Sequence, residues 1–290
     1  MKNGFYTALG TPLDEAGYLV EESFIKHVED QVAAGAVGLL VMGSMGNQSG
    51  IRNSEYAKVA KIAVETIKGR CPVFVGVMDN SISRVMDRIN SLKGLDIDGV
   101  VATAPFYYAP TQNAIKCFFE CIAQKSSYPL YMYDLPSVTK VKISIDSIEY
   151  LMGNNNIKGI KTGDLMTVKS LMLHPSKRDD FHVMFSGLDI FDVAYKYGIK
   201  KSLDGMFACT APIAKRMYES FENGSFETAT KCLEDILLLR NTFVEVGVFE
   251  GFSYAMNVLG FNGIFAPDYN KINAETMEKV RVCMQQIGLI

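Results

Sequence analysis

The feature that most constrains the fold of this chain is an eightfold alternation of two hydrophobic patterns. Short apolar runs rich in β-branched residues recur along the 290 residues, and each is followed by a longer segment with the apolar spacing of an α-helix. Because the runs are almost continuously apolar, they indicate strands of a parallel sheet that is covered on both faces. The predicted strands are residues 5–9, 37–42, 72–77, 99–103, 129–133, 157–161, 182–185 and 203–208.

Eight parallel strands joined by crossover helices can close into a barrel or form an open, doubly wound sheet. The chain lacks a Gly-x-Gly-x-x-Gly motif after its first predicted strand, where an open sheet that binds a dinucleotide would carry it. Polar and aromatic residues instead follow the C-terminal ends of several strands, where the active sites of barrels lie. We therefore predict an α/β fold: a TIM (β/α)8 barrel over residues 1–223 and a C-terminal three-helix extension over residues 224–290, packed as one structural unit.

Composition narrows the class of protein. The chain is 48% hydrophobic and 21% charged, which are ordinary values for a globular protein, and its net charge at pH 7 is −3. Lys and Arg are scattered, so we expect no nucleic-acid partner, and no apolar run reaches ~18 residues, so we expect no membrane span. The N-terminal segment lacks the apolar core of a signal peptide, so we place the protein in the cytoplasm.

The cysteines and histidines do not form a metal-binding pattern. Cys117 and Cys121 are the only close cysteine pair, and their spacing is that of one helical turn within an amphipathic segment. Neither a Cys-x-x-Cys nor a His-Glu-x-x-His motif is present. We therefore expect reduced thiols and no metal site.

The sixth predicted strand ends on Lys161, at the end of the barrel where the chemistry of this fold takes place. Burial disfavours a charged ammonium group, so a lysine that points into an apolar barrel favours the neutral amine. That amine is a nucleophile that forms Schiff bases with ketones, and the resulting cation accepts electrons when a neighbouring carbon–carbon bond breaks. Taken alone, the residue also fits a strand-end lysine whose amine reaches solvent.

Three other strand ends carry polar groups. Tyr133, at the end of the fifth predicted strand, is either a proton shuttle or a core tyrosine. The loop after the second strand contains Gly43, Ser44 and Gly46, and it offers backbone N–H groups and a hydroxyl to a carboxylate. Asp189, after the seventh strand, is either a helix N-cap, which is the commoner use of such a residue, or a ligand of substrate hydroxyl groups.

The loop after the fourth predicted strand places Phe106, Tyr107 and Tyr108 in a row between two prolines. We predict that this loop forms a lid or a subunit contact, because so much exposed aromatic surface is unfavourable on an isolated barrel. Symmetric pairing would bury the rings, and we expect a homotetramer built as a dimer of dimers.

Five motifs, in the order of the barrel strands and over nearly the whole chain, together resemble one family. This is the dihydrodipicolinate synthase and N-acetylneuraminate lyase family of Schiff-base aldolases. The matching segments are Gly43-Ser44-Met45-Gly46-Asn47, Ala104-Pro105-Phe106-Tyr107, Tyr133 with Pro136, Gly159-Ile160-Lys161, and Leu203-Asp204-Gly205-Met206-Phe207-Ala208.

The resemblance implies a catalytic cycle. Lys161 would form an imine with the ketone of a 2-oxo acid, usually pyruvate, and Tyr133 would move protons beside it with help from the Ser44 hydroxyl. In the family, the residue that matches Tyr107 reaches across a subunit interface and completes this relay. The glycine loop would hold the carboxylate. No metal or organic cofactor is implied, because the imine itself takes up the electrons.

The chain departs from the family pattern at positions that contact the substrate. Met45 replaces the second loop hydroxyl, which anchors the carboxylate, and Asn47 replaces the loop glutamate. Val138 stands where dihydrodipicolinate synthases carry the arginine that binds the carboxylate of the second substrate. The loop after Lys161 also resembles the family loop shortened by about two residues. The substrate-binding positions implied by the resemblance are Gly43, Met45, Gly46, Val138, Gly187, Asp189 and Gly205.

The segment from Ser186 to Asp189 resembles the part of the neuraminate lyases that grips sugar hydroxyls, although Ile190 replaces their glutamate and Cys209 a nearby serine. We therefore expect a Schiff-base carbon–carbon lyase that acts on a 2-oxo acid with pyruvate as the imine-forming partner. It would be N-acetylneuraminate-lyase-like or a 2-keto-3-deoxy sugar acid aldolase. Two alternatives remain open: a dihydrodipicolinate synthase, which Val138 disfavours, and a non-catalytic paralogue that binds a small acid.

Overall fold

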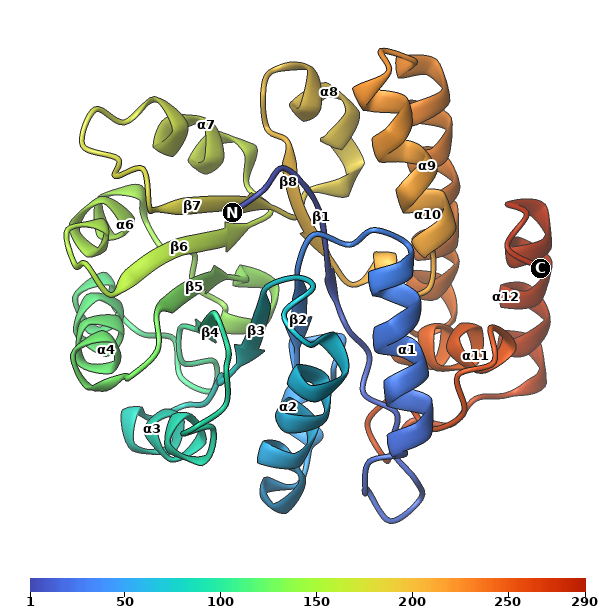
Figure 1. The fold of residues 1–290 in the computed structure, drawn as a ribbon, viewed down its shortest axis with the longest axis horizontal. Coiled ribbons are helices and arrows are strands. Elements are labelled where there is room, and N and C mark those ends of the chain that lie inside the picture. Colours follow the sequence, from blue (N-terminus) through green and yellow to red (C-terminus); the bar gives the residue numbers. More distant parts are fainter.

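The computed structural model describes all residues 1–290. Its eight strands form one closed parallel barrel, in which each strand pairs with the next and the last pairs with the first (Figure 1). The strands are β1 (Gly4–Ala8), β2 (Leu39–Val41), β3 (Val73–Gly76), β4 (Gly99–Thr103), β5 (Leu130–Asp134), β6 (Ile157–Thr162), β7 (His182–Phe185) and β8 (Lys201–Asp204).

Helices follow every strand and cover the outside of the barrel (Figure 1). They are α1 (Glu21–Ala33), α2 (Asn53–Ile67), α3 (Ile82–Ser91), α4 (Gln112–Lys125), α5 (Pro136–Thr139), α6 (Ile145–Met152), α7 (Leu165–Leu173), α8 (Phe191–Lys196) and α9 (Ala211–Glu222). No helix combines the length and the hydropathy that a membrane crossing requires.

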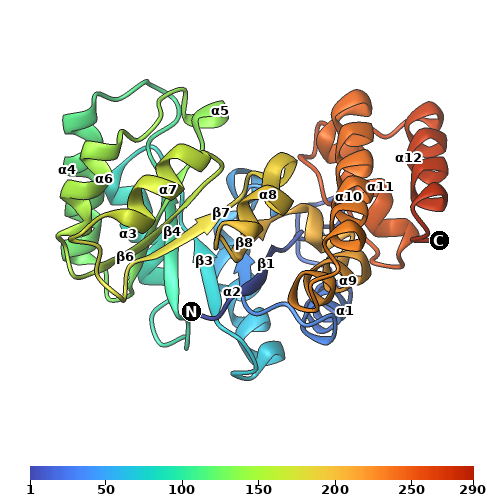
Figure 2. The ribbon, with the colours of Figure 1, turned by 90° about the horizontal axis from the view of Figure 1, so that it is seen from above.

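Three more helices complete the chain: α10 (Phe226–Val246), α11 (Val248–Val258) and α12 (Ala274–Gln286). They lie together on one side of the barrel, where α10 packs against α9 (Figure 2). The predicted TIM barrel with a helical C-terminal extension is confirmed, while the division of the chain at residue 223 stays a prediction.

The eighth strand differs from the sequence prediction. It ends at Asp204, and Met206–Ala208 form a turn of 3-10 helix instead of continuing the strand. The Asp204 carboxylate accepts a hydrogen bond from the N–H of Met206 at 2.8 Å, which turns the chain at this point. Periodicity alone does not distinguish a short apolar strand from a buried helical turn, which is why the prediction ran on to residue 208.

Polar side chains set the starts of two helices in the way that the sequence indicates. Ser81 caps α3 and Thr111 caps α4, because each hydroxyl accepts a hydrogen bond from a backbone N–H in the first turn. These caps begin the helices shortly after β3 and β4, so the loops that leave the C-terminal rim of the barrel stay short on this side.

Large side chains fill the inside of the barrel by lying over glycines. The ring of Tyr131 occupies the space beside Gly99 and Gly159, where an added β-carbon would lie 2.7 Å and 3.0 Å from ring atoms. Gly38 makes room for the ring of Tyr6 in the same way. The interior cluster consists of Tyr6, Ala8, Leu40, Phe74, Met78, Val101, Tyr131, Tyr133, Met184 and Leu203.

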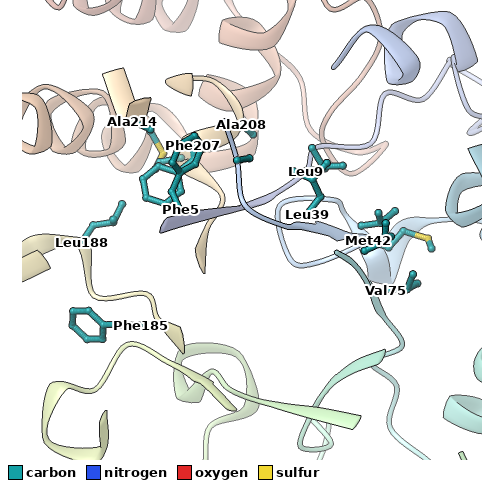
Figure 3. Close-up of a cluster of buried hydrophobic side chains, with 14 of the residues drawn as sticks. Phe5, Leu9, Leu39, Met42, Val75, Phe185, Leu188, Phe207, Ala208 and Ala214 are labelled. Atoms are coloured by element: carbon teal, nitrogen blue, oxygen red, sulfur yellow. The ribbon is translucent and has the colours of Figure 1, made fainter. Parts of the chain in front are cut away.

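A larger apolar core lies between the strands and the surrounding helices, and Figure 3 shows part of it. Phe5 of β1 points into this outer core and packs edge-on against Phe207, with ring centroids 5.6 Å apart. Its neighbour Tyr6 points into the barrel instead. Both faces of β1 are therefore buried, which explains why the predicted strands are continuously apolar.

Gly159→Ala should destabilise the barrel, because the new methyl group would lie 2.2 Å from the carbonyl oxygen of His182 and 3.0 Å from the Tyr131 ring. Overpacking of this kind costs about 1–3 kcal/mol, so we expect a lower midpoint in urea unfolding followed by circular dichroism. Gly163→Ala is the control, since its methyl group would lie 3.6 Å from the nearest atom. Equal midpoints for the two variants would contradict this account of the interior.

Candidate active site

The centre of the site is a buried lysine–tyrosine pair at the C-terminal end of the barrel. The register of β5 and β6 places Tyr133 directly opposite Lys161. The Lys161 Nζ donates a hydrogen bond of 2.8 Å to the Tyr133 hydroxyl and lies 4.0 Å from the centroid of its ring. Both side chains are buried. Lys158 of the same strand points outward instead and pairs with Asp180, as the alternation of side chains along a strand requires.

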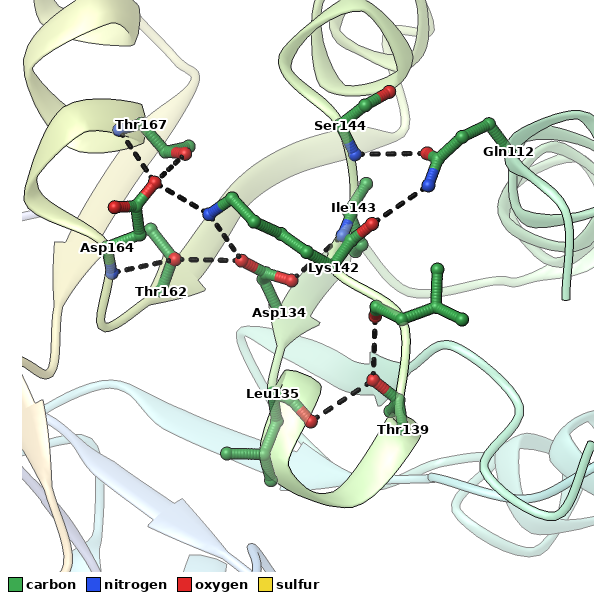
Figure 4. A network of polar contacts seen from close by, with 11 residues as sticks. Gln112, Asp134, Leu135, Thr139, Lys142, Ile143, Ser144, Thr162, Asp164 and Thr167 are labelled. Atoms are coloured by element: carbon green, nitrogen blue, oxygen red, sulfur yellow. Dashed lines mark hydrogen bonds and ion pairs between the residues drawn. The ribbon is translucent and has the colours of Figure 1, made fainter. Parts of the chain in front are cut away.

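The residues that follow the pair on these strands, Asp134 and Thr162, belong to a network of polar contacts on the opposite face of the sheet (Figure 4). Thr162 Oγ1 donates a hydrogen bond of 3.0 Å to Asp134 Oδ2, and the N–H of Ile143 donates one of 3.0 Å to Asp134 Oδ1. The Lys142 Nζ lies 3.4 Å from Asp134 Oδ2 and 2.6 Å from Asp164 Oδ2. This network ties the ends of β5 and β6 together one residue beyond the candidate catalytic groups.

Asp164 connects the network to α7. Burial raises the pKa of its carboxyl group, but hydrogen bonds from Lys142 and Thr167 outweigh burial and lower the pKa to about 2. The carboxylate is therefore ionised at neutral pH, and it caps α7 by accepting a hydrogen bond of 3.1 Å from the N–H of Thr167.

A second carboxyl group lies near the lysine from the side of β8. Burial raises the pKa of Asp204, while the charges of Lys161 and Arg240 act in the opposite direction. The sequence analysis quoted Asp204 within a motif but did not assign it to the site.

A cavity of about 210 Å³ opens at this end of the barrel; its wall includes Thr103, which pairs with Tyr133, but neither Lys161 nor Tyr133 itself. Two predicted site residues line it: Ser44, from the loop after β2, and Val138, from α5. The other lining residues are Gln48, Ser49, Met78, Thr103, Phe106, Leu135 and Phe249. None of the nine side chains carries a charge, so the cavity is neutral and largely apolar.

The sequence analysis missed two informative members of this wall. Thr103 lies two residues after Val101 on β4 and shares its inward face, so the period of the strand would have identified it. Phe249 comes from α11 in the C-terminal extension. No local pattern places it there, because only the packing of the extension on the barrel brings it to the cavity.

The predicted glycine loop turns tightly after β2. A β-carbon at Gly46 would lie 2.9 Å from the carbonyl oxygen of Leu9, so only glycine fits this turn. The side chain of Met45 lies against Gly205, where an added β-carbon would come within 2.1 Å of its Cγ. The structure thus places the turn that contains Gly43, Met45 and Gly46 against Gly205, with a thioether where the family pattern has a hydroxyl.

Asp189 and Gly187 do not join the cavity wall. The Asp189 carboxylate forms a two-point ion pair with Arg240, with both distances 2.7 Å, and it caps no helix. The preference for an N-cap at this position was therefore wrong. Arg240 keeps the pKa of Asp189 below its usual range. Both carboxylate oxygens accept a hydrogen bond from Arg240, and the side chain remains exposed to solvent.

The aromatic loop after β4 is fixed through its backbone and exposes its rings. The Asn80 Oδ1 accepts hydrogen bonds of 2.8 Å from the N–H groups of Phe106 and Tyr107. Tyr107 is 68% exposed and Tyr108 80% exposed, and their rings pack edge-on with centroids 4.8 Å apart. Tyr107 does not line the cavity of its own chain, whereas Phe106 does.

No group of three or more His, Cys, Asp or Glu side chains is arranged to bind a metal ion. The groups that this site offers for chemistry are the Lys161 amine, the Tyr133 phenol and the Ser44 hydroxyl.

Comparison of the chain with known proteins identifies its family. Residues 1–287 match the family model described as the Dihydrodipicolinate synthetase family. A 4-hydroxy-tetrahydrodipicolinate synthase of Bartonella bacilliformis is 29% identical over 297 aligned residues, which cover 100% of this chain and 99% of the relative.

Two solved structures have the same fold. One is a dihydrodipicolinate synthase variant described as monomeric, with a TM-score of 0.88, 21% identity and coverage of 100% of this chain and 98% of the other. The second is an E. coli K12 prophage protein of the dihydrodipicolinic acid synthase family in complex with pyruvate, with a TM-score of 0.90, 18% identity and full coverage of both chains.

The family match agrees with the resemblance carried by the five sequence motifs. The Bartonella relative bears the name of the synthase, which the sequence analysis had placed second, after a neuraminate-lyase-like or sugar acid aldolase. The chain therefore belongs to the dihydrodipicolinate synthetase family, and it is a class I aldolase type of enzyme that makes or breaks carbon–carbon bonds through a lysine Schiff base.

Proposed function

We propose that this protein is a pyruvate-dependent aldolase in which Lys161 forms the Schiff base and Tyr133 moves the protons. The observation that carries this proposal is the buried hydrogen bond between the Lys161 Nζ and the Tyr133 hydroxyl at the C-terminal end of the barrel. The pyruvate complex of the prophage protein supports pyruvate as the compound that forms the imine.

The proposed cycle conserves atoms and protons. The Lys161 amine attacks C2 of pyruvate, and loss of water gives the imine. Loss of a proton from C3 gives an enamine, whose C3 then attacks the carbonyl carbon of an aldehyde while the aldehyde oxygen takes up a proton. Hydrolysis of the imine releases the product and restores the amine, and the reverse sequence cleaves the same bond. Tyr133 lies within hydrogen-bond reach of the reacting nitrogen, so its hydroxyl can take and return these protons. Ser44, which lines the cavity, would assist it, as the resemblance to the family implies.

The second substrate is the point on which the relatives and the cavity differ. A second candidate function is 4-hydroxy-tetrahydrodipicolinate synthesis, which the name of the Bartonella relative favours. Val138 on the cavity wall opposes it, because this position offers no cation to an acidic aldehyde. A neuraminate-lyase-like activity has less support. The Asp189 carboxylate, which would bind sugar hydroxyls in such an enzyme, is ion-paired with Arg240.

Assembly also enters the proposal. We infer a homotetramer built as a dimer of dimers, in which Tyr107 enters the site of a neighbouring chain and links Ser44 to Tyr133. The exposed rings of Tyr107 and Tyr108 support a contact at this loop. One related variant is described as monomeric, so the barrel itself does not require assembly.

Incubation with pyruvate and borohydride should attach one reduced pyruvyl group, which peptide mass spectrometry should locate on Lys161. Lys161→Ala should abolish both the adduct and turnover. Lys158→Ala is the matched control from the same strand, and it should keep both because its amine points outward to Asp180. An adduct on another lysine, or none at millimolar pyruvate, would overturn the assignment.

Wild-type protein should condense pyruvate with aspartate semialdehyde poorly. Val138→Arg should raise kcat/KM for this aldehyde by roughly 10- to 100-fold, the value of a hydrogen bond to a charged group of about 1.5–3 kcal/mol. Val138→Met adds length without charge and should give no gain. Wild-type turnover at about 1–10³ s⁻¹ would instead identify the protein as the synthase and contradict the role given to Val138.

Tyr107→Phe should slow catalysis by roughly 10²- to 10⁴-fold, the usual effect of losing a positioned proton-transfer group. Tyr108→Phe should have little effect. Mixing the inactive Lys161→Ala and Tyr107→Phe proteins under conditions of subunit exchange should restore activity, because some mixed pairs regain one intact site. If exchange is demonstrated and no activity returns, Tyr107 does not act across an interface.

A further inference from the structure

The wall of the cavity of about 210 Å³ contains a buried hydroxyl group that has no partner. Thr103 is 2% exposed, and its Oγ1 makes no hydrogen bond within the protein. Leaving a buried polar group unsatisfied costs about 1–3 kcal/mol. Such groups are uncommon in native proteins, and each one suggests a ligand or another role that outweighs its cost.

The barrel places this hydroxyl in the same row as the candidate catalytic groups. Thr103 on β4 pairs with Tyr133 on β5, which in turn pairs with Lys161 on β6. Neighbouring strands are about 4.8 Å apart, so Thr103 stands one strand from the phenol and two from the amine. The amine and the phenol already bond to each other, and the threonine hydroxyl remains the uncommitted group of the row.

The other side chains of the cavity determine what kind of molecule fits next to this row. Five are apolar: Met78, Phe106, Leu135, Val138 and Phe249. The amide of Gln48 is already engaged, because its Nε2 donates a hydrogen bond of 2.9 Å to the carbonyl oxygen of Met78. A carboxylate placed here would lose its hydration without gaining a cation, and a chain of hydroxyls would meet mostly apolar walls.

We propose that the second substrate is an uncharged aldehyde with an apolar chain: the Thr103 hydroxyl binds the aldehyde oxygen, and the apolar wall of the cavity selects the chain. The inference rests on the proposed function, because the aldehyde must meet an enamine formed on Lys161. The hydrogen bond from Thr103 polarises the carbonyl group toward attack. No covalent bond to Thr103 forms, and the proton gained by the aldehyde oxygen comes from the relay described above.

Three four-carbon aldehydes test the substrate class: butanal, succinic semialdehyde and erythrose. They represent an apolar chain, a chain with a carboxylate and a polyhydroxy chain. With pyruvate in excess, product formation followed by mass spectrometry should give a kcat/KM for butanal at least 10-fold above each of the others. An equal or higher value for succinic semialdehyde or erythrose would overturn the inference.

Thr103→Val keeps the shape of the side chain and removes its hydroxyl. It should lower kcat/KM for butanal by roughly 3- to 10-fold, the effect of one ordinary hydrogen bond, and Thr103→Ser should recover most of the loss. Thr11→Val is the matched control, because Thr11 is equally buried, also lacks a partner and does not line the cavity. Equal rates for Thr103→Val and wild type would remove Thr103 from substrate binding.

Borohydride trapping of pyruvate separates failure of this inference from failure of the proposed function. If the wild type forms no adduct on Lys161, the proposed function fails and this inference fails with it. If the adduct forms but butanal is not used, only the inference is overturned. A matching fall in adduct formation by Thr103→Val would assign the hydroxyl to the lysine rather than to the aldehyde, and would also overturn it.

Discussion

The limited space inside an eight-stranded barrel governs the rest of this structure. A ring as large as that of Tyr131 fits there only because Gly99 and Gly159 on the flanking strands carry no side chain. The ring closes the middle of the barrel, and the next inward residue of the same strand is Tyr133, which meets Lys161. The glycines thereby admit the ring that lies one inward position before the lysine–tyrosine pair.

The geometry of that pair also depends on the outer face of the same two strands. Asp134 and Thr162 bond to each other one residue beyond the pair, and Lys142 joins them to the start of α7 through Asp164. Because side chains alternate along a strand, a register shift that broke this outer network would also separate the amine from the phenol. The register of β5 and β6 thus determines both the polar network and the position of the lysine–tyrosine pair.

Membership of the family accounts for the chemistry, and the walls of the cavity bear on the choice of the second substrate. The C-terminal extension contributes twice at this end of the barrel: α11 supplies Phe249 to the cavity, and α10 supplies Arg240, which engages Asp189. Phe249 and Val138 make part of the wall apolar, and the ion pair gives Asp189 a cationic partner. The proposed preference for an uncharged aldehyde with an apolar chain rests on these walls.

The sequence by itself indicated the barrel and placed Lys161 and Tyr133 at the C-terminal ends of two consecutive strands, because apolar runs and helical periods are local properties. Strand period alone left open whether the Lys161 amine points inward, and the resemblance to the family identified it as the catalytic group. Only the tertiary structure decided the ends of β8, the pairing of Asp189 with Arg240 and the neutral composition of the cavity. These features depend on which distant segments pack against one another, and no periodicity within a segment records its partners. For the same reason the unpartnered hydroxyl of Thr103 became visible only once the neighbours of its strand were known.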